Sequence, residues 1–149
     1  MLRNIVILKK QKGFTLLELV VMLSIIIVLA TIITITLGAA RVRTRDAKRI
    51  SNIQEIKTAL EDYYFDENEY PSAITAGNPL IGPTSTKTYL STIPNNPTPR
   101  NDGSCPDNDY IYTQDGSGTS YHIIFCLGVS LNELSAGTAH ATPQGIFSQ

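Results

Sequence analysis

Residues 12–40 read KGFTLLELVVMLSIIIVLATIITITLGAA and contain the longest apolar run of the chain. From Leu19 to Leu37 it holds 19 consecutive uncharged residues, close to the roughly 20 that cross about 30 Å of hydrocarbon as a helix. The run is rich in β-branched residues, but lipid offers an isolated strand no hydrogen-bond partners, so only a helix can span it. The sequence therefore predicts a transmembrane helix over residues 14–40.

A short basic segment precedes this helix. It contains no acid and four cations, Arg3, Lys9, Lys10 and Lys12. That polarity is typical of a targeting segment, yet in an ordinary secretory signal a short apolar stretch comes before the cleavage site. Here the basic residues end at Gly13 and the long apolar run follows. We interpret residues 1–13 as a leader.

Glu18 is the one charged residue inside the apolar run. A carboxylate near the centre of a membrane helix costs about 2.5–3.5 kcal/mol, less near an interface. One interpretation is an interfacial glutamate that reaches water and is favoured by the helix dipole. The other is a carboxylate that meets a cationic partner.

Residues 12–18, KGFTLLE, lie between a basic leader and an apolar run, and this arrangement resembles the class III signal of type IV pilins and type II secretion pseudopilins. The resemblance implies that a membrane peptidase cuts the bond between Gly13 and Phe14 and methylates the new amine of Phe14. It also implies that Glu18 is the assembly glutamate, which neutralises the Phe14 amine of a neighbouring subunit in an apolar filament core.

Residues 41–68 carry an amphipathic pattern that continues the helix. Residues recur every three to four positions, at Ile50, Ile53, Ile56 or Lys57, Leu60 and Tyr63 or Tyr64, which predicts an amphipathic helix with one buried stripe. The two helical segments should form one long helix, ended by Asn68 in the left-handed conformation and by Pro71. This region also resembles the segment after the apolar helix in pilins and major pseudopilins.

Residues 69–149 are rich in turns and carry the expected head of the molecule. A loop-rich part with a short strand near residues 89–93 leads to a hairpin over 109–113 and 120–127. The hairpin needs an apolar surface, and the helical stripe supplies it. The predicted fold is α+β and pilin-like: a long N-terminal α-helix, with a transmembrane half and an amphipathic half, packed on a small antiparallel β-sheet head.

Cys105 and Cys126 are the two cysteines of the chain. They would be free thiols in a cytosolic protein, whereas outside the cytoplasm a disulfide is favoured; closing about 20 residues stabilises by about 3 kcal/mol. Basic residues flank both ends of the apolar run, so their count does not choose an orientation. The cysteines and the resemblance predict a single-pass cytoplasmic membrane protein with an extracytoplasmic C-terminal head, later part of an extracellular or periplasmic filament.

The sequence shows no catalytic constellation, and we predict that the protein is not an enzyme and needs no cofactor. His122 lies in a strand pattern and His140 in a small-residue tail, and both are assigned non-catalytic roles, with no metal-ligand spacing. Type II secretion major pseudopilins bind calcium in a carboxyl-side loop. Four acids here could offer oxygen ligands, but their spacing matches no calcium motif: Asp102, Asp107, Asp109 and Asp115.

Five basic residues lie between Arg41 and Arg49 and raise the question of nucleic acid, because helix cations can contact phosphates. Lipid phosphates or acids of adjacent subunits are the stronger alternatives. Losing the four leader cations changes the formal net charge from −1 to −5. An acidic mature chain does not favour DNA binding.

The resemblance implies a prepilin-like precursor of a structural subunit that polymerises into a type IV pilus or related filament. The alternatives are a type II secretion pseudopilin that helps export folded proteins and a DNA-uptake or adhesive minor pilin. A membrane-anchored head that forms no polymer is a further alternative. The expected partners are copies of itself or other pilins, a prepilin peptidase, an inner-membrane assembly platform and the lipid bilayer before assembly.

Overall fold

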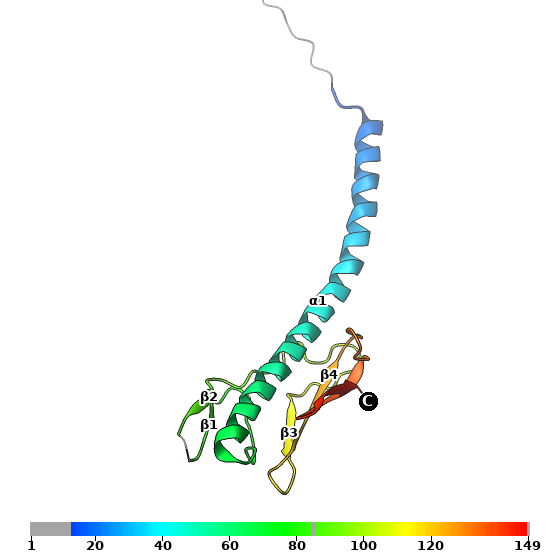
Figure 1. Ribbon diagram of the computed structural model, residues 1–149. Coiled ribbons are helices and arrows are strands. Elements are labelled where there is room, and N and C mark those ends of the chain that lie inside the picture. The colour runs from blue at the N-terminus through cyan, green and yellow to red at the C-terminus, as the bar shows by residue number, and fades with distance from the viewer. Residues whose placement is uncertain (1–12, 85, 149) are drawn as a thin grey trace, which may run out of the picture. The chain divides into compact units, whose positions relative to one another are not determined.

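The computed structural model describes residues 13–84 and 86–148, so the predicted leader, apart from Gly13, lies outside the described residues. Helix α1 (Leu16–Glu67) comes first (Figure 1). The strands that follow are β1 (Leu80–Ile81), β2 (Thr88–Leu90), β3 (Ile111–Gln114), β4 (Tyr121–Leu127), β5 (Gly137–Thr142) and β6 (Gly145–Ser148). The chain divides into two compact units, Met1–Gly38 and Ala39–Gln149.

The end of α1 is set by its sequence. The backbone N–H of Asn68 donates to the Tyr64 carbonyl at 2.9 Å, and Asn68 has a φ of 62°. Asparagine tolerates this left-handed conformation and thereby closes the helix, while Pro71 lacks the N–H to continue it. The predicted helix end is confirmed.

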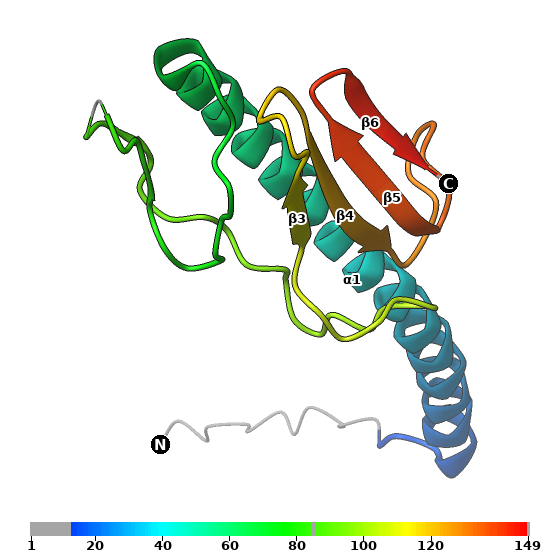
Figure 2. The ribbon, with the colours of Figure 1, turned by 90° about the horizontal axis from the view of Figure 1, so that it is seen from below.

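The core of the second unit lies between α1 and a four-stranded antiparallel sheet of order β3-β4-β5-β6 (Figure 2). Every second residue of β4 is buried from Tyr121 to Leu127. They meet the helical stripe, in which Ile53, Ile56, Leu60 and Tyr63 are buried. The α+β fold, the stripe and the hairpin, observed as β3 and β4, are therefore confirmed.

The small-residue tail around His140 was predicted wrongly, because it forms strands β5 and β6. Ala139 and Ala141 are fully buried in β5, where small side chains let the strand lie close to the rest of the core. Their alternation with Thr138 and His140 has weak hydrophobic contrast, so a pattern search misses it. The short strand expected near residues 89–93 is β2, which pairs with β1 on the other side of α1 from the sheet (Figure 1).

Candidate functional site

The start of α1 positions the residues predicted for processing and assembly. Gly13 and Phe14 precede the helix and are exposed. Thr15 caps the helix, because its Oγ1 accepts a hydrogen bond from the backbone N–H of Glu18 at 3.2 Å and so satisfies a first-turn donor. The peptide bond predicted to be cut therefore lies in exposed chain directly before the helix.

Glu18 occupies the third helical position after Thr15, the spacing of a capping box. Its carboxylate is exposed and lies at the positive end of the helix dipole, which favours it. It forms no ion pair within the described part of the chain. No lysine or arginine occurs between residues 14 and 40, so no side chain of this stretch can neutralise Glu18.

The first part of α1 presents an apolar surface without a partner in the described chain. The large hydrophobic side chains from Leu16 to Ile32 are 47–80% exposed, far beyond the scattered apolar residues of a soluble surface. By length and composition, α1 is long and apolar enough to cross a membrane. A surface of this kind requires lipid or other apolar helices.

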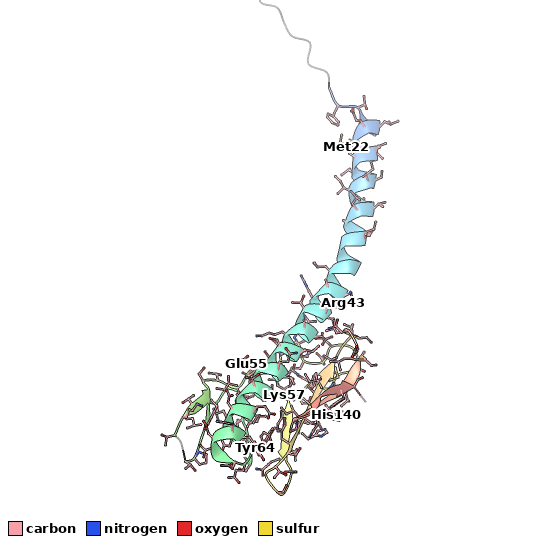
Figure 3. The ribbon with its side chains drawn as sticks, in the orientation of Figure 1. Met22, Arg43, Glu55, Lys57, Tyr64 and His140 are labelled. Atoms are coloured by element: carbon pink, nitrogen blue, oxygen red, sulfur yellow. A yellow bond between two sulfur atoms is a disulfide. The ribbon has the colours of Figure 1, made fainter. Side chains whose placement is uncertain are left out.

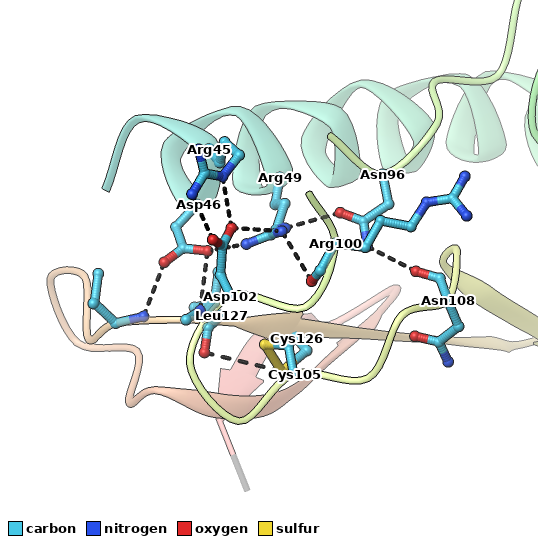
Figure 4. Close-up of a disulfide and its surroundings, with 12 residues drawn as sticks. Arg45, Asp46, Arg49, Asn96, Arg100, Asp102, Cys105, Asn108, Cys126 and Leu127 are labelled. Carbon is cyan, nitrogen blue, oxygen red and sulfur yellow. Dashed lines mark hydrogen bonds and ion pairs between the residues drawn. A yellow bond between two sulfur atoms is a disulfide. The ribbon is translucent and has the colours of Figure 1, made fainter. Parts of the chain in front are cut away.

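The second unit contains a buried ionic cluster, which we call the Arg49 clasp: Arg45, Asp46, Arg49, Asn96 and Asp102. The Arg49 side chain is fully buried. Its guanidinium donates to Asp46 at 2.5 Å and to Asn96 at 2.8 Å, and lies 3.0 Å from Asp102 (Figure 4). Two loop carbonyls also accept from it, those of Pro99 and Arg100 at 3.1 and 3.2 Å. The clasp thus fixes the loop before β3 to α1.

Asp102 receives a second guanidinium. Arg45 donates to both of its carboxylate oxygens, at 2.7 and 2.5 Å, the bidentate geometry of strong charge-assisted pairs. The Arg45 hydrogen bonds hold the pKa of Asp102 below its usual value, and Arg49 lowers it further, against the opposing effect of burial. Asp102 is therefore a carboxylate at neutral pH.

Two further links tie this region together. Asp46 accepts hydrogen bonds from the backbone N–H groups of Gly128 at 3.1 Å and Val129 at 2.9 Å, so the clasp also holds the loop after β4. Cys105 and Cys126 form a disulfide (Figure 4), as expected from the two cysteines. The loop before β3 is thus joined both to α1 and to β4.

Three of the four acids considered as calcium ligands have partners within the head. Asp102 belongs to the clasp, and Asp109 pairs with Arg100 at 2.8 Å. Asp115 accepts the Ser120 N–H at 3.0 Å. Among the described residues, no three His, Cys, Asp or Glu side chains converge to hold a metal. Calcium takes 6–8 oxygen ligands, and the described residues bring no three such acids together.

The structure also brings together two residues that the sequence kept apart. The imidazoles of His122 in β4 and His140 in β5 lie 2.6 Å apart, from Nε2 to Nδ1. They are 18 residues apart in the chain, and only the pairing of β4 with β5 makes them neighbours. The sequence would have indicated this pair only if β5 had been predicted as a strand next to β4.

Known proteins share these features. The family model for the prokaryotic N-terminal methylation motif matches residues 8–34. Type II secretion system core protein G of Pectobacterium carotovorum subsp. carotovorum is 33% identical over 117 residues, which cover 77% of this chain and 67% of that protein. The protein of the same name from Vibrio cholerae serotype O1 is 30% identical over 140 residues, which cover 87% of this chain and 88% of that protein. This chain belongs to the pilin and pseudopilin family. No solved structure matches it significantly.

Family membership confirms the resemblance seen in residues 12–18 and again after residue 41. Pilins and pseudopilins are structural subunits. The relatives also change the ranking of functions: core protein G of the type II secretion system fits the matches better than the type IV pilus subunit favoured from the sequence.

Proposed function

We propose that this pseudopilin-family chain is a subunit of a type II secretion pseudopilus, a filament that helps export folded proteins. The observation that carries the proposal is the extent of the match. The methylation motif covers only residues 8–34, whereas the similarity to core protein G of Vibrio cholerae covers 87% of the chain. The similarity therefore includes the head as well as the apolar helix.

Processing starts the proposed assembly. A prepilin peptidase cuts between Gly13 and Phe14 and methylates the Phe14 amine, which stays positively charged. The first part of α1 anchors the subunit in the cytoplasmic membrane as a single span, with the head outside the cytoplasm. Lipid is as apolar as the helix, so helices associate there through close packing and polar contacts rather than through the hydrophobic effect.

Glu18 supplies the polar contact. Its own backbone N–H is already capped by Thr15, and its carboxylate has no cationic partner in the described chain. When lipid is exchanged for neighbouring helices, an isolated carboxylate is costly. The methylated Phe14 amine of an adjacent subunit neutralises Glu18, and each of these two charges removes the cost of the other. The pair thereby sets the position of one subunit against the next.

Deletion of the gene tests the choice of filament. If the chain is a pseudopilin, the deletion should stop the export of folded proteins into the medium while surface pili persist. Loss of pili with normal export would instead establish a pilus subunit.

The intact mass of the mature protein tests the processing step and should correspond to residues 14–149 plus one methyl group. An uncut chain would contradict the processing step.

A matched pair of variants tests the assembly glutamate. Glu18→Ala should leave membrane insertion and processing intact and abolish filaments. Ser24→Ala is the control. It removes a polar group from the same helix, where the Ser24 hydroxyl donates to the Val21 carbonyl at 2.7 Å. Normal filament yield from Glu18→Ala would refute the role of Glu18 without affecting the family assignment.

A further inference from the structure

The pair of histidines lies on the outer face of the sheet. In β4 the residues that alternate with the buried ones point away from α1, and His122 is exposed among them. His140 lies on the same face of β5, opposite Ile124 in the strand register and hence diagonal to His122. Figure 3 shows His140 on the side of the sheet turned away from the helix.

The two rings converge through ring nitrogens. His122 Nε2 and His140 Nδ1 are 2.6 Å apart, and the ring centroids are 4.7 Å apart with the planes inclined at 67°. At this distance one nitrogen carries a proton and the other offers its lone pair. A metal ion can take the place of that proton, since both nitrogens then face it with lone pairs.

The geometry suits a transition metal. Imidazole nitrogen binds Zn²⁺ at about 2.0–2.1 Å, and two such bonds at a tetrahedral angle place the nitrogens about 3.3 Å apart. The rings must therefore separate by about 0.7 Å from the observed 2.6 Å. Both lie on an open face of the sheet, so small side-chain rotations suffice.

Oxygen-bearing side chains lie beside one of the two histidines. His122 borders a hollow of about 310 Å³ whose lining does not include His140, and that lining contains Thr113, Asp115, Ser120 and Thr142. Among the described residues no third histidine, cysteine or acid joins the pair as a direct ligand. Water would occupy the remaining positions, and Asp115 adds negative charge at the edge of the hollow.

We propose that His122 and His140 form a surface site for a divalent transition-metal ion that bridges β4 and β5. The site goes beyond the proposed filament function and does not depend on it. Imidazole selects Zn²⁺, Ni²⁺ or Cu²⁺ and not the hard cations Ca²⁺ and Mg²⁺, which require oxygen ligands. The proposed ion is therefore distinct in chemistry and ligands from the calcium of secretion pseudopilins.

Zinc and nickel titrations of the mature full-length chain in detergent test the site. The protein is prepared without a histidine tag, and Cu²⁺ is not used because the N-terminal amine also binds it. Calorimetry should show one ion per chain, and the two imidazoles, the only ones in the chain, should give shifted NMR resonances. The ion should also raise the Tm by several degrees, because it binds only the folded pairing of β4 and β5.

Three variants decide the outcome. His122→Gln and His140→Gln should each weaken zinc binding by about tenfold or more, the range seen when a metal loses supporting groups. Thr138→Val, an exposed substitution of similar shape on β5, should bind like the wild type. The proposal is overturned if the wild type binds zinc no better than His122→Gln and His140→Gln, or if zinc binds while the resonances of both imidazoles stay unchanged.

Discussion

Replacing Arg49 by methionine should be among the most damaging single changes in the head. Methionine matches the unbranched stem of arginine and keeps its packing, but it lacks the guanidinium and cannot donate hydrogen bonds. The change leaves the Asn96 carbonyl oxygen and two loop carbonyls without their donor. It also removes one of the cations that face Asp46 and Asp102.

The magnitude follows from burial. Breaking a buried ion pair by removing one partner costs about 3–5 kcal/mol, because the remaining charge is left uncompensated. Arg49 is fully buried, yet Asp102 retains Arg45 and Asp46 retains two backbone N–H groups. We therefore expect a loss of about 3 kcal/mol, the lower end of that range, which is a large part of the roughly 5–15 kcal/mol that stabilises a typical domain.

Urea unfolding of the full chain in detergent measures this loss. The chain has no tryptophan and seven tyrosines, and several of the tyrosines are buried in the core, so near-ultraviolet circular dichroism reports on the head. Lys48→Met, an exposed neighbour on α1, is the control and should change stability by less than about 0.5 kcal/mol. A loss below about 1 kcal/mol for Arg49→Met would refute the clasp as the element that fixes the loop to the helix.

Three further predictions concern the same region. Cys105→Ser, which opens a link between residues 21 apart, should lower the free energy of unfolding by about 3 kcal/mol, and reduction of the wild type should give the same loss. The folded-state pKa of Asp102 is depressed, mainly by Arg45, so its contribution is present above about pH 4 and lost as pH falls through that lower pKa. Asp102→Asn should accordingly be less stable than the wild type at pH 7, and the difference should shrink in urea titrations at progressively lower pH. Calcium should leave the Tm unchanged, and a calcium-dependent rise in Tm would contradict this prediction.

Much of the fold followed from the sequence because its strongest signals are local. The uncharged run up to Leu37 allows one structure in lipid, and the stripe from Ile53 to Tyr63 has a helical period that the structure reproduces. Asn68 and Pro71 mark a helix end by their backbone preferences alone. Each of these inferences needs only neighbouring residues and the solvent around them.

The features that were missed depend on pairings across the chain. The alternation of buried and exposed residues in β5 is weak in the sequence, because its buried residues Ala139 and Ala141 are only slightly hydrophobic. They are buried because β5 pairs with β4. The His122 and His140 pair depends on that same register. The clasp joins α1 to a loop about 50 residues away in sequence. A pattern of neighbouring residues cannot predict such a contact.

The clasp also changes the meaning of the basic segment at residues 41–49. As sequence, its five cations formed one cluster that suited phosphates of lipid or nucleic acid. In the folded head Arg45 and Arg49 turn inward and are neutralised by Asp46 and Asp102. Only the cations on the other helical faces stay exposed, namely Arg41, Arg43 and Lys48. A polyanion would therefore meet three of the five charges, and because each neutralised phosphate adds to the salt-dependent affinity, the inward turn of two arginines weakens the case for DNA. In this helical segment, the arginines on one face therefore hold the loop of the head. The cations on the other faces remain available to lipid or a neighbouring subunit.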